Sequence, residues 1–237
     1  MARFGGVLSA IAIVPSAPVM VPQLAAAAAA ETADLRAAAL SAAAALPPRW
    51  VGIGTASRDS VAGPESIGTF AGYGVDVRVG LSPEAVALGG GPAQLPLCAL
   101  IAGWLRGLAQ PAATAQMRAF HGGHDLATAL DIGRRLRAEI DGTDDPIGVL
   151  VVADGANTLS PPAPGGYQPE SIPVQAALDD ALAEGDGNAL TRLPEGIVGR
   201  IAYQVLAGLT EPAPASAKEL YRGAPYGVGY FVGLWYP

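Results

Sequence analysis

Short apolar runs alternate along the chain with longer segments in which apolar residues recur every three or four positions. A short apolar run between turn residues is typical of a buried strand, whereas recurrence every three or four positions indicates a helix. The runs predict strands at residues 8–14, 50–55, 114–120, 147–152 and 226–235, and a half-exposed strand at 75–79. The helical pattern predicts helices at residues 25–46, 95–108, 125–140, 171–184 and 189–209.

The order of these elements defines a fold class, because strands and helices alternate throughout. This order predicts a single α/β domain over residues 1–237, with a mostly parallel central sheet and helices on both faces. Ligands of such sheets bind beyond the carboxyl ends of the strands. A functional site is therefore expected among residues 15–18, 55–59, 89–94, 121–125 and 154–160.

Composition narrows the range of partners. The chain has 237 residues, with 14 Lys and Arg against 21 Asp and Glu, which gives a net charge of −7. This acidic balance argues against a nucleic-acid partner, which needs a cationic surface. Pro, Gly or a charged residue interrupts every apolar stretch before it reaches the length of a membrane span, so no membrane partner is expected. Cys98 is the single cysteine, which excludes a disulfide framework and a cysteine-based metal site.

The amino terminus shares some features with a secretory signal peptide. Arg3 precedes an apolar segment at residues 7–21, and an alanine run follows. Pro15 and Pro18 interrupt the apolar segment, however, and the alanine run continues into a predicted amphipathic helix. We therefore expect a cytoplasmic protein whose first apolar run is a core strand, with secretion as the alternative.

Both histidines of the chain lie in one segment, His121-Gly-Gly-His124, which Asp125 follows directly. Two imidazoles and one carboxylate can hold Fe(II) or zinc, so the pair forms a candidate metal site with Asp154 or Asp125. A His-x-x-His pair outside a helix is a weak metal signal, and a polar turn with Asp125 as a helix cap explains the same residues. We favour the turn.

Polar residues also follow the other predicted strands. Asp154 and Asn157 come after the strand at 147–152, and Arg58 and Asp59 come after the strand at 50–55. Asp154 could act as a general base or a cation ligand, and Arg58 could bind an anionic ligand. Ordinary turn chemistry and an ion-paired loop explain the same residues, so both interpretations stay open.

Two further segments have structural interpretations: one as a helix surface, the other as part of the core or of an interface. Asp179 and Asp180 are expected to lie on a solvated helix face. Residues 221–236 hold four of the seven tyrosines together with Phe231 and Trp235. Such aromatic side chains could line the core or an interface with a partner subunit.

Three segments carry a family resemblance. The first, residues 14–22, lies at the end of the first predicted strand and reads Val-Pro-Ser-Ala-Pro-Val-Met-Val-Pro. The second, residues 150–156, contains a strand and a glycine loop. The third, residues 224–232, leads into the last strand. Together they resemble the class III extradiol ring-cleavage dioxygenase superfamily, in particular small actinobacterial-type proteins similar to its catalytic B subunit. The first segment is similar to the family's C-P-H-P-P-L-L-V-P. The likeness spans nearly the whole chain in order, and it implies one α/β domain around a central sheet.

At the family's functional positions, however, this chain carries other residues. By this resemblance the first iron-binding histidine falls at Ser16, and the second falls within residues 55–59, which contain no histidine. The glutamate ligand falls near Gly199, with Tyr203 as the aromatic residue four positions later, and the catalytic histidine falls near Thr158. Neutral Ser, Thr and Gly do not replace imidazole and carboxylate as Fe(II) ligands. The resemblance therefore implies the fold without the ring-opening reaction.

The leading hypothesis is a non-catalytic protein with a degenerate iron site and no cofactor, which serves as a small-ligand-binding or assembly module. Its expected cleft is lined by Ser16, Arg58, Asp59, Asp154, Asn157 and Thr158. A small neutral or anionic organic ligand suits this lining better than a metal. The alternative is an active dioxygenase or hydrolase with Fe(II) or zinc at His121, His124 and Asp154. A third reading is a structural subunit beside a catalytic chain, and we expect a homo-oligomer or a partner protein subunit.

Overall fold

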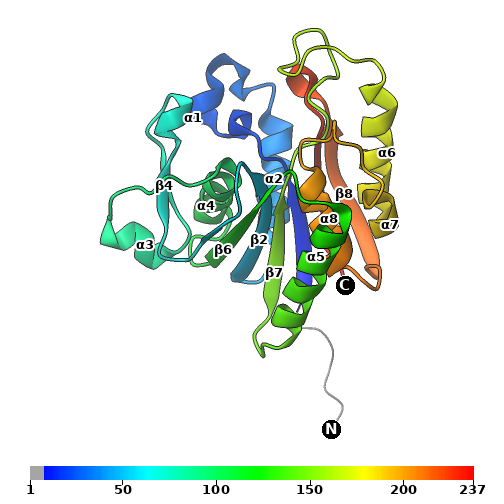
Figure 1. Ribbon diagram of the computed structural model, residues 1–237. Helices are drawn as coiled ribbons and strands as arrows, with labels where there is room; N and C mark the ends of the chain where they lie inside the picture. The colour runs from blue at the N-terminus through cyan, green and yellow to red at the C-terminus, as the bar shows by residue number, and fades with distance from the viewer. Residues whose placement is uncertain (1–7) are drawn as a thin grey trace.

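The computed structural model describes residues 8–237, which form one α/β domain around a seven-stranded sheet (Figure 1). The strand order is β3-β6-β2-β7-β1-β9-β8, and the four central strands, β6, β2, β7 and β1, are parallel. The edge strands β3 and β8, and β9 between β1 and β8, run antiparallel to their neighbours. The strands of this sheet are β1 (Leu8–Val14), β2 (Arg49–Ala56), β3 (Ser60–Ala62), β6 (Thr114–His121), β7 (Ile147–Val152), β8 (Ser216–Gly223) and β9 (Tyr230–Tyr236). The predicted mostly parallel sheet is confirmed.

Helices cover both faces of the sheet, as the sequence predicts (Figure 1). α2 (Ala33–Ala44) and α4 (Leu97–Ala109) pack on one face, and α5 (Leu126–Asp141), α6 (Ser171–Glu184) and α8 (Arg200–Leu209) pack on the other. The shorter helices are α1 (Pro22–Ala25), α3 (Pro83–Leu88) and α7 (Gly187–Leu190), with 3-10 turns at Pro18–Met20, Ala26–Ala29, Phe70–Tyr73 and Pro225–Gly227. β4 (Ile67–Thr69) and β5 (Arg78–Gly80) form a separate two-stranded pair.

The central strands separate two hydrophobic cores because successive side chains of a strand point to opposite faces. In β1, Ala12 and Val14 belong to the core beneath α2 and α4, whereas Ile11 and Ile13 belong to the core beneath α5, α6 and α8. All four side chains are fully buried. Burial on both faces explains why these strands are continuous apolar runs in the sequence.

Two predicted helices are broken in the structure. The alanine-rich segment predicted as one helix over residues 25–46 contains α1, a 3-10 turn and then α2, which begins only at Ala33. Ala26 has a positive φ of 45°, and the buried Thr32 hydroxyl donates to the carbonyl groups of Val19 and Ala28. These contacts tie the segment to the preceding loop and interrupt the helix. The predicted helix at 189–209 is likewise divided into α7 and α8, with Pro194 between them.

Two strand predictions also need correction, and strands β3, β4 and β8 were not predicted. The strand expected at 75–79 lies at β5, and the last strand begins at Tyr230 rather than at residue 226, because Tyr226 sits in a turn with φ of 59°. The pattern missed β8 because it is a partly exposed edge strand that carries Lys218, Glu219 and Arg222 instead of an apolar run.

The carboxyl-terminal aromatic residues mostly fill the core. Phe231 and Trp235 are at most 1% exposed, and the indole N–H of Trp235 donates to the carbonyl group of Leu182 at 2.7 Å. Tyr230 is also buried, whereas Tyr226 and Tyr236 are exposed. The core interpretation therefore holds for most of this segment.

The features of the amino terminus that resembled a targeting signal fall partly outside the described residues, since Arg3 and Val7 precede Leu8. Residues 8–14 form the buried strand β1, as the core interpretation predicts. Within residues 8–237, every helix is too short or too polar to cross a bilayer.

Candidate functional site

The carboxyl ends of β1 and β7 lie side by side at the upper edge of the sheet in Figure 1. The chain leaves β1 toward α2 on one face of the sheet and leaves β7 toward α6 on the other. In folds of this kind, ligands usually bind beside the carboxyl ends of neighbouring strands whose connections diverge in this way. The structure places Ser16 and Asp154 at this position.

Asp154 is held in place by the backbone of the β1 loop. The backbone N–H of Ser16 donates to Asp154 Oδ1 at 2.8 Å, and the N–H of Ala153 donates to the carbonyl oxygen of Val14 at 2.9 Å. Burial raises the pKa of the Asp154 carboxyl to about 7, although the Ser16 N–H opposes this shift. Near neutral pH this carboxyl therefore exists in both forms, so it can donate or accept a hydrogen bond.

The α8 helix supplies the next wall of the site. The N–H of Gly199 donates to the Asp154 carbonyl oxygen at 2.8 Å, and a Cβ atom on Gly199 would lie 2.7 Å from that oxygen. Only glycine fits this approach without displacing the backbone. The Tyr203 hydroxyl donates to the carbonyl oxygen of Ala153 at 3.0 Å. Burial, followed by the negative charge of Asp154, raises the pKa values of Tyr203 and Tyr230.

Asn157 and Thr158 form hydrogen bonds within the loop between β7 and α6 and to the first residue of α6. The Thr158 hydroxyl donates to Ser171 Oγ at 2.7 Å, and the carbonyl oxygen of Asn157 accepts a hydrogen bond from Gly165 at 2.9 Å. Ser171 is the first residue of α6. The predicted cleft residues Asn157 and Thr158 thus fold this loop onto itself and onto α6.

A buried polar pair that the sequence interpretation missed supports the same loop. The side-chain oxygen of Gln175 accepts a hydrogen bond from the Ala156 N–H at 2.8 Å, and its Nε2 donates to Asp179 Oδ1 at 2.8 Å. Asp179 is only 8% exposed, and burial raises its pKa to about 6. The expected solvated face is therefore wrong for Asp179. Asp180 is exposed and pairs with Arg222. The four-residue spacing of Gln175 and Asp179 on one helix face was the available signal.

Asp59 joins the two histidines at the carboxyl ends of β2 and β6. His124 Nε2 lies 2.8 Å from Asp59 Oδ2, and the His121 backbone N–H donates to Asp59 Oδ1 at 2.6 Å. The pKa of Asp59 is lowered chiefly by that backbone hydrogen bond. Asp125 caps α5 by accepting a hydrogen bond from Thr128, as the turn interpretation predicts. Asp154 follows β7, and β2 separates β7 from β6, which leads to the two histidines.

Arg58 lines a separate pocket. This cavity of about 440 Å³ is bounded by the β2–β3 connection and by Gln94, Leu95 and Pro96 before α4. The six expected cleft residues therefore divide into four groups. Ser16 lies with Asp154, Asp59 lies with the histidines, Arg58 lies in its own pocket, and Asn157 and Thr158 lie within the β7–α6 loop.

The donor atoms around Asp154 do not fit Fe(II). Two of the positions that the resemblance assigns to iron ligands, Ser16 and Gly199, do contact Asp154. They carry a neutral hydroxyl and no side chain, however, and Asp154 Oδ1 already accepts a hydrogen bond. An oxygenase iron site needs two imidazoles and a carboxylate on one face. Within residues 8–237, no group of three His, Cys, Asp or Glu side chains is arranged to hold a metal ion.

The structure is that of an α/β protein with a largely parallel sheet and a polar contact between Ser16 and Asp154 at the carboxyl ends of two central strands. The chain is similar to the crystal structure of the uncharacterized protein JW3007 from Escherichia coli K12, with a TM-score of 0.53 and 12% identity over 95% of this chain and 99% of that one. At this identity the similarity concerns the fold alone. No protein family's sequence model matches the chain, and no curated protein matches it.

Proposed function

We propose that this protein is a non-catalytic, dioxygenase-like binding protein that takes a small hydroxyl-bearing organic ligand between the ends of β1 and β7. One observation carries this proposal: Asp154, whose pKa is raised to about 7, lies where such folds bind ligands and is held by the Ser16 N–H. A carboxyl group that can be neutral or ionised near pH 7 suits a ligand hydroxyl group, which both donates and accepts hydrogen bonds.

The residues at the expected iron-ligand positions support the part of this proposal that excludes ring cleavage. Ser16 and Gly199 stand where iron ligands are expected, and neither supplies an imidazole or a carboxylate. The remaining chemistry at the site consists of hydrogen bonding by Asp154 and Ser16 beside the buried Tyr203 and Tyr230. These groups bind and orient a ligand without a bound oxidant.

The first test measures binding and oxygen chemistry on the same purified full-length chain, prepared without chelators or a metal-binding tag. Catechol serves as the probe because it carries two hydroxyl groups on a small ring. We expect calorimetric binding of catechol, weakened at least tenfold by Asp154→Ala and unchanged by Asp59→Ala, which removes a carboxylate at another strand end. We also expect no catechol-dependent oxygen uptake after anaerobic incubation with Fe(II).

Two results would overturn the proposal. The first is a failure of catechol to bind, or equal binding by the Asp154→Ala variant. The second is near-stoichiometric iron or zinc together with oxygen uptake, both lost when His121 and His124 are replaced by alanine. That second result would establish the alternative of a relocated metal enzyme at the histidine pair.

A further inference from the structure

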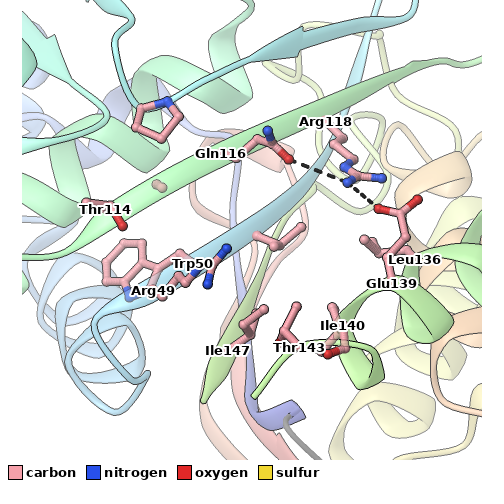
Figure 2. Close-up of a pocket in the computed structure, with 13 residues that line it drawn as sticks. Arg49, Trp50, Thr114, Gln116, Arg118, Leu136, Glu139, Ile140, Thr143 and Ile147 are labelled. Carbon is pink, nitrogen blue, oxygen red and sulfur yellow. Dashed lines mark hydrogen bonds and ion pairs between the residues drawn. The ribbon is translucent and has the colours of Figure 1, made fainter. Parts of the chain in front are cut away.

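A second polar pocket lies at the opposite end of the sheet from Asp154. Its cavity of about 210 Å³ is bounded by the first residues of β2, β6 and β7 and by the last turns of α5 (Figure 2). Thr114, Gln116 and Arg118 share one face of β6, whereas the intervening Ala115 and Met117 are buried in the opposite core. The period of two therefore directs the polar side chains of β6 toward this pocket.

The lining of the pocket contains more arginines than carboxylates although the chain is acidic. Its lining contains two arginines, Arg49 and Arg118, and one carboxylate, Glu139, in a chain of net charge −7. Arg49 pairs with Asp145 at 3.0 Å, but both side chains are more than half exposed, so this ion pair is weak and can open. When that pair opens, Arg49 is free to attract an anionic group that enters the pocket.

Arg118 has an unused hydrogen-bond donor. Its Nη2 donates to Glu139 Oε2 at 2.5 Å and reaches Gln116 Oε1 at 3.5 Å. Its Nε–H is shielded from solvent and has no partner among the residues that the structure describes. A buried donor without a partner is uncommon in folded proteins and calls for an acceptor at that place. A carboxylate supplies two acceptor oxygens in the geometry that a guanidinium group matches.

The rest of the pocket lining is largely apolar. Figure 2 shows Gln116 and Arg118 on one side of the cavity and Ile140, Thr143 and Ile147 on the other. Leu136 extends this apolar wall. A cavity of 210 Å³ equals the liquid volume of about seven water molecules, which leaves room for a carboxylate and a short hydrocarbon body.

We propose that this pocket binds a small aliphatic carboxylic acid, with its carboxylate at the Arg118 guanidinium and its hydrocarbon body against Leu136, Ile140 and Ile147. Arg49 stands at the entrance and adds attraction for the anion. This site is independent of Asp154, because the two lie at opposite ends of β7 and share no residue.

The test uses cyclohexanecarboxylate and its uncharged analogue of the same shape, cyclohexanecarboxamide. Backbone amide signals of the full-length chain are followed by ¹⁵N NMR during each titration. We expect the carboxylate to shift the signals of Thr114–Arg118 and Leu136–Thr143 and to bind at least tenfold more tightly than the carboxamide. Arg118→Met should weaken carboxylate binding at least tenfold. Arg192→Met, which removes an exposed arginine outside this pocket, should bind as the unmodified protein does.

The variants are compared only after thermal unfolding confirms that each is folded, and Arg118→Lys provides a charge-retaining second variant. Absence of shifts at these amides, or equal binding of acid and amide, would overturn the proposal. So would a loss of binding in Arg192→Met as large as in Arg118→Met. Because the catechol experiment probes the other end of the sheet, either proposal can fail without the other.

Discussion

Replacing Asp154 by asparagine is expected to stabilise the protein at pH 8.5 by about 2 to 4 kcal/mol and to leave its stability at pH 4 nearly unchanged. The pKa of Asp154 is raised from 3.8 to about 7 by burial, so the folded state binds this proton more tightly than the unfolded chain does. As the pH rises from about 4 to 7, the unfolded chain loses the proton first, and stability falls at about 1.4 kcal/mol per pH unit. Asparagine is neutral at every pH and still accepts the hydrogen bond from the Ser16 N–H.

Urea unfolding of both proteins at pH 4, 6, 7 and 8.5 checks this prediction. Asp179, whose pKa is raised to about 6, still titrates in the variant, so a smaller decline in stability should persist there. Asp144→Asn serves as the control, because Asp144 is exposed and its replacement removes a carboxylate without changing the buried one. A variant that is no more stable than the unmodified protein at pH 8.5 would show that Asp154 is ionised at little cost.

Replacing Gly133 by alanine is expected to destabilise the protein by about 3 kcal/mol or more, because helices α5 and α8 touch backbone to backbone. A Cβ atom on Gly133 would lie 2.2 Å from the Val205 carbonyl oxygen and 2.6 Å from the Leu209 nitrogen. Gly208 meets Leu130 in the same way, with 2.3 Å to its carbonyl oxygen. Main-chain atoms cannot rotate away as a side chain can, so the helices must separate and lose packing.

The matched control is Gly107→Ala in α4. An added Cβ there meets no atom within 4 Å, and alanine favours a helix over glycine by about 0.5 to 1 kcal/mol. The control should therefore gain stability by a similar amount, and thermal and urea unfolding of the two variants should give opposite signs. A Gly133→Ala protein within 1 kcal/mol of the unmodified chain would contradict the close contact between α5 and α8.

The elements that the sequence predicted well are those whose local pattern and burial agree. β1 and β7 have the predicted bounds because strands buried on both faces are continuous apolar runs with turn residues at their ends. α6 also matches residues 171–184, since Gly185, with φ of 75°, ends it with a left-handed cap. β8 was missed because an exposed edge strand carries charged residues, which protect it from pairing with other chains.

Which polar residues meet at the carboxyl edge of the sheet depends on the strand order and not on the local sequence pattern. Ser16 and Asp154 were predicted near one site, and they meet because β1 and β7 are neighbours in the sheet. Asp59 was assigned to the same cleft, yet it binds His124 because β2 also neighbours β6. Strand order decides such pairings, and no local pattern in residues 50–60 or 147–157 specifies it.

By itself the sequence determined the α/β class, the buried central strands, the acidic charge and the absence of histidine and glutamate at the positions where the family resemblance expects iron ligands. These properties depend only on residue type and on the pattern of residues close together in the sequence. Only the tertiary structure decided that Asp154 is shielded beside Ser16 and that Asp179 is buried against Gln175. It also decided that the Arg118 Nε–H finds no acceptor among residues 8–237. The burial of these groups depends on elements that are distant in the sequence, so it arises only when the sheet and its helices assemble.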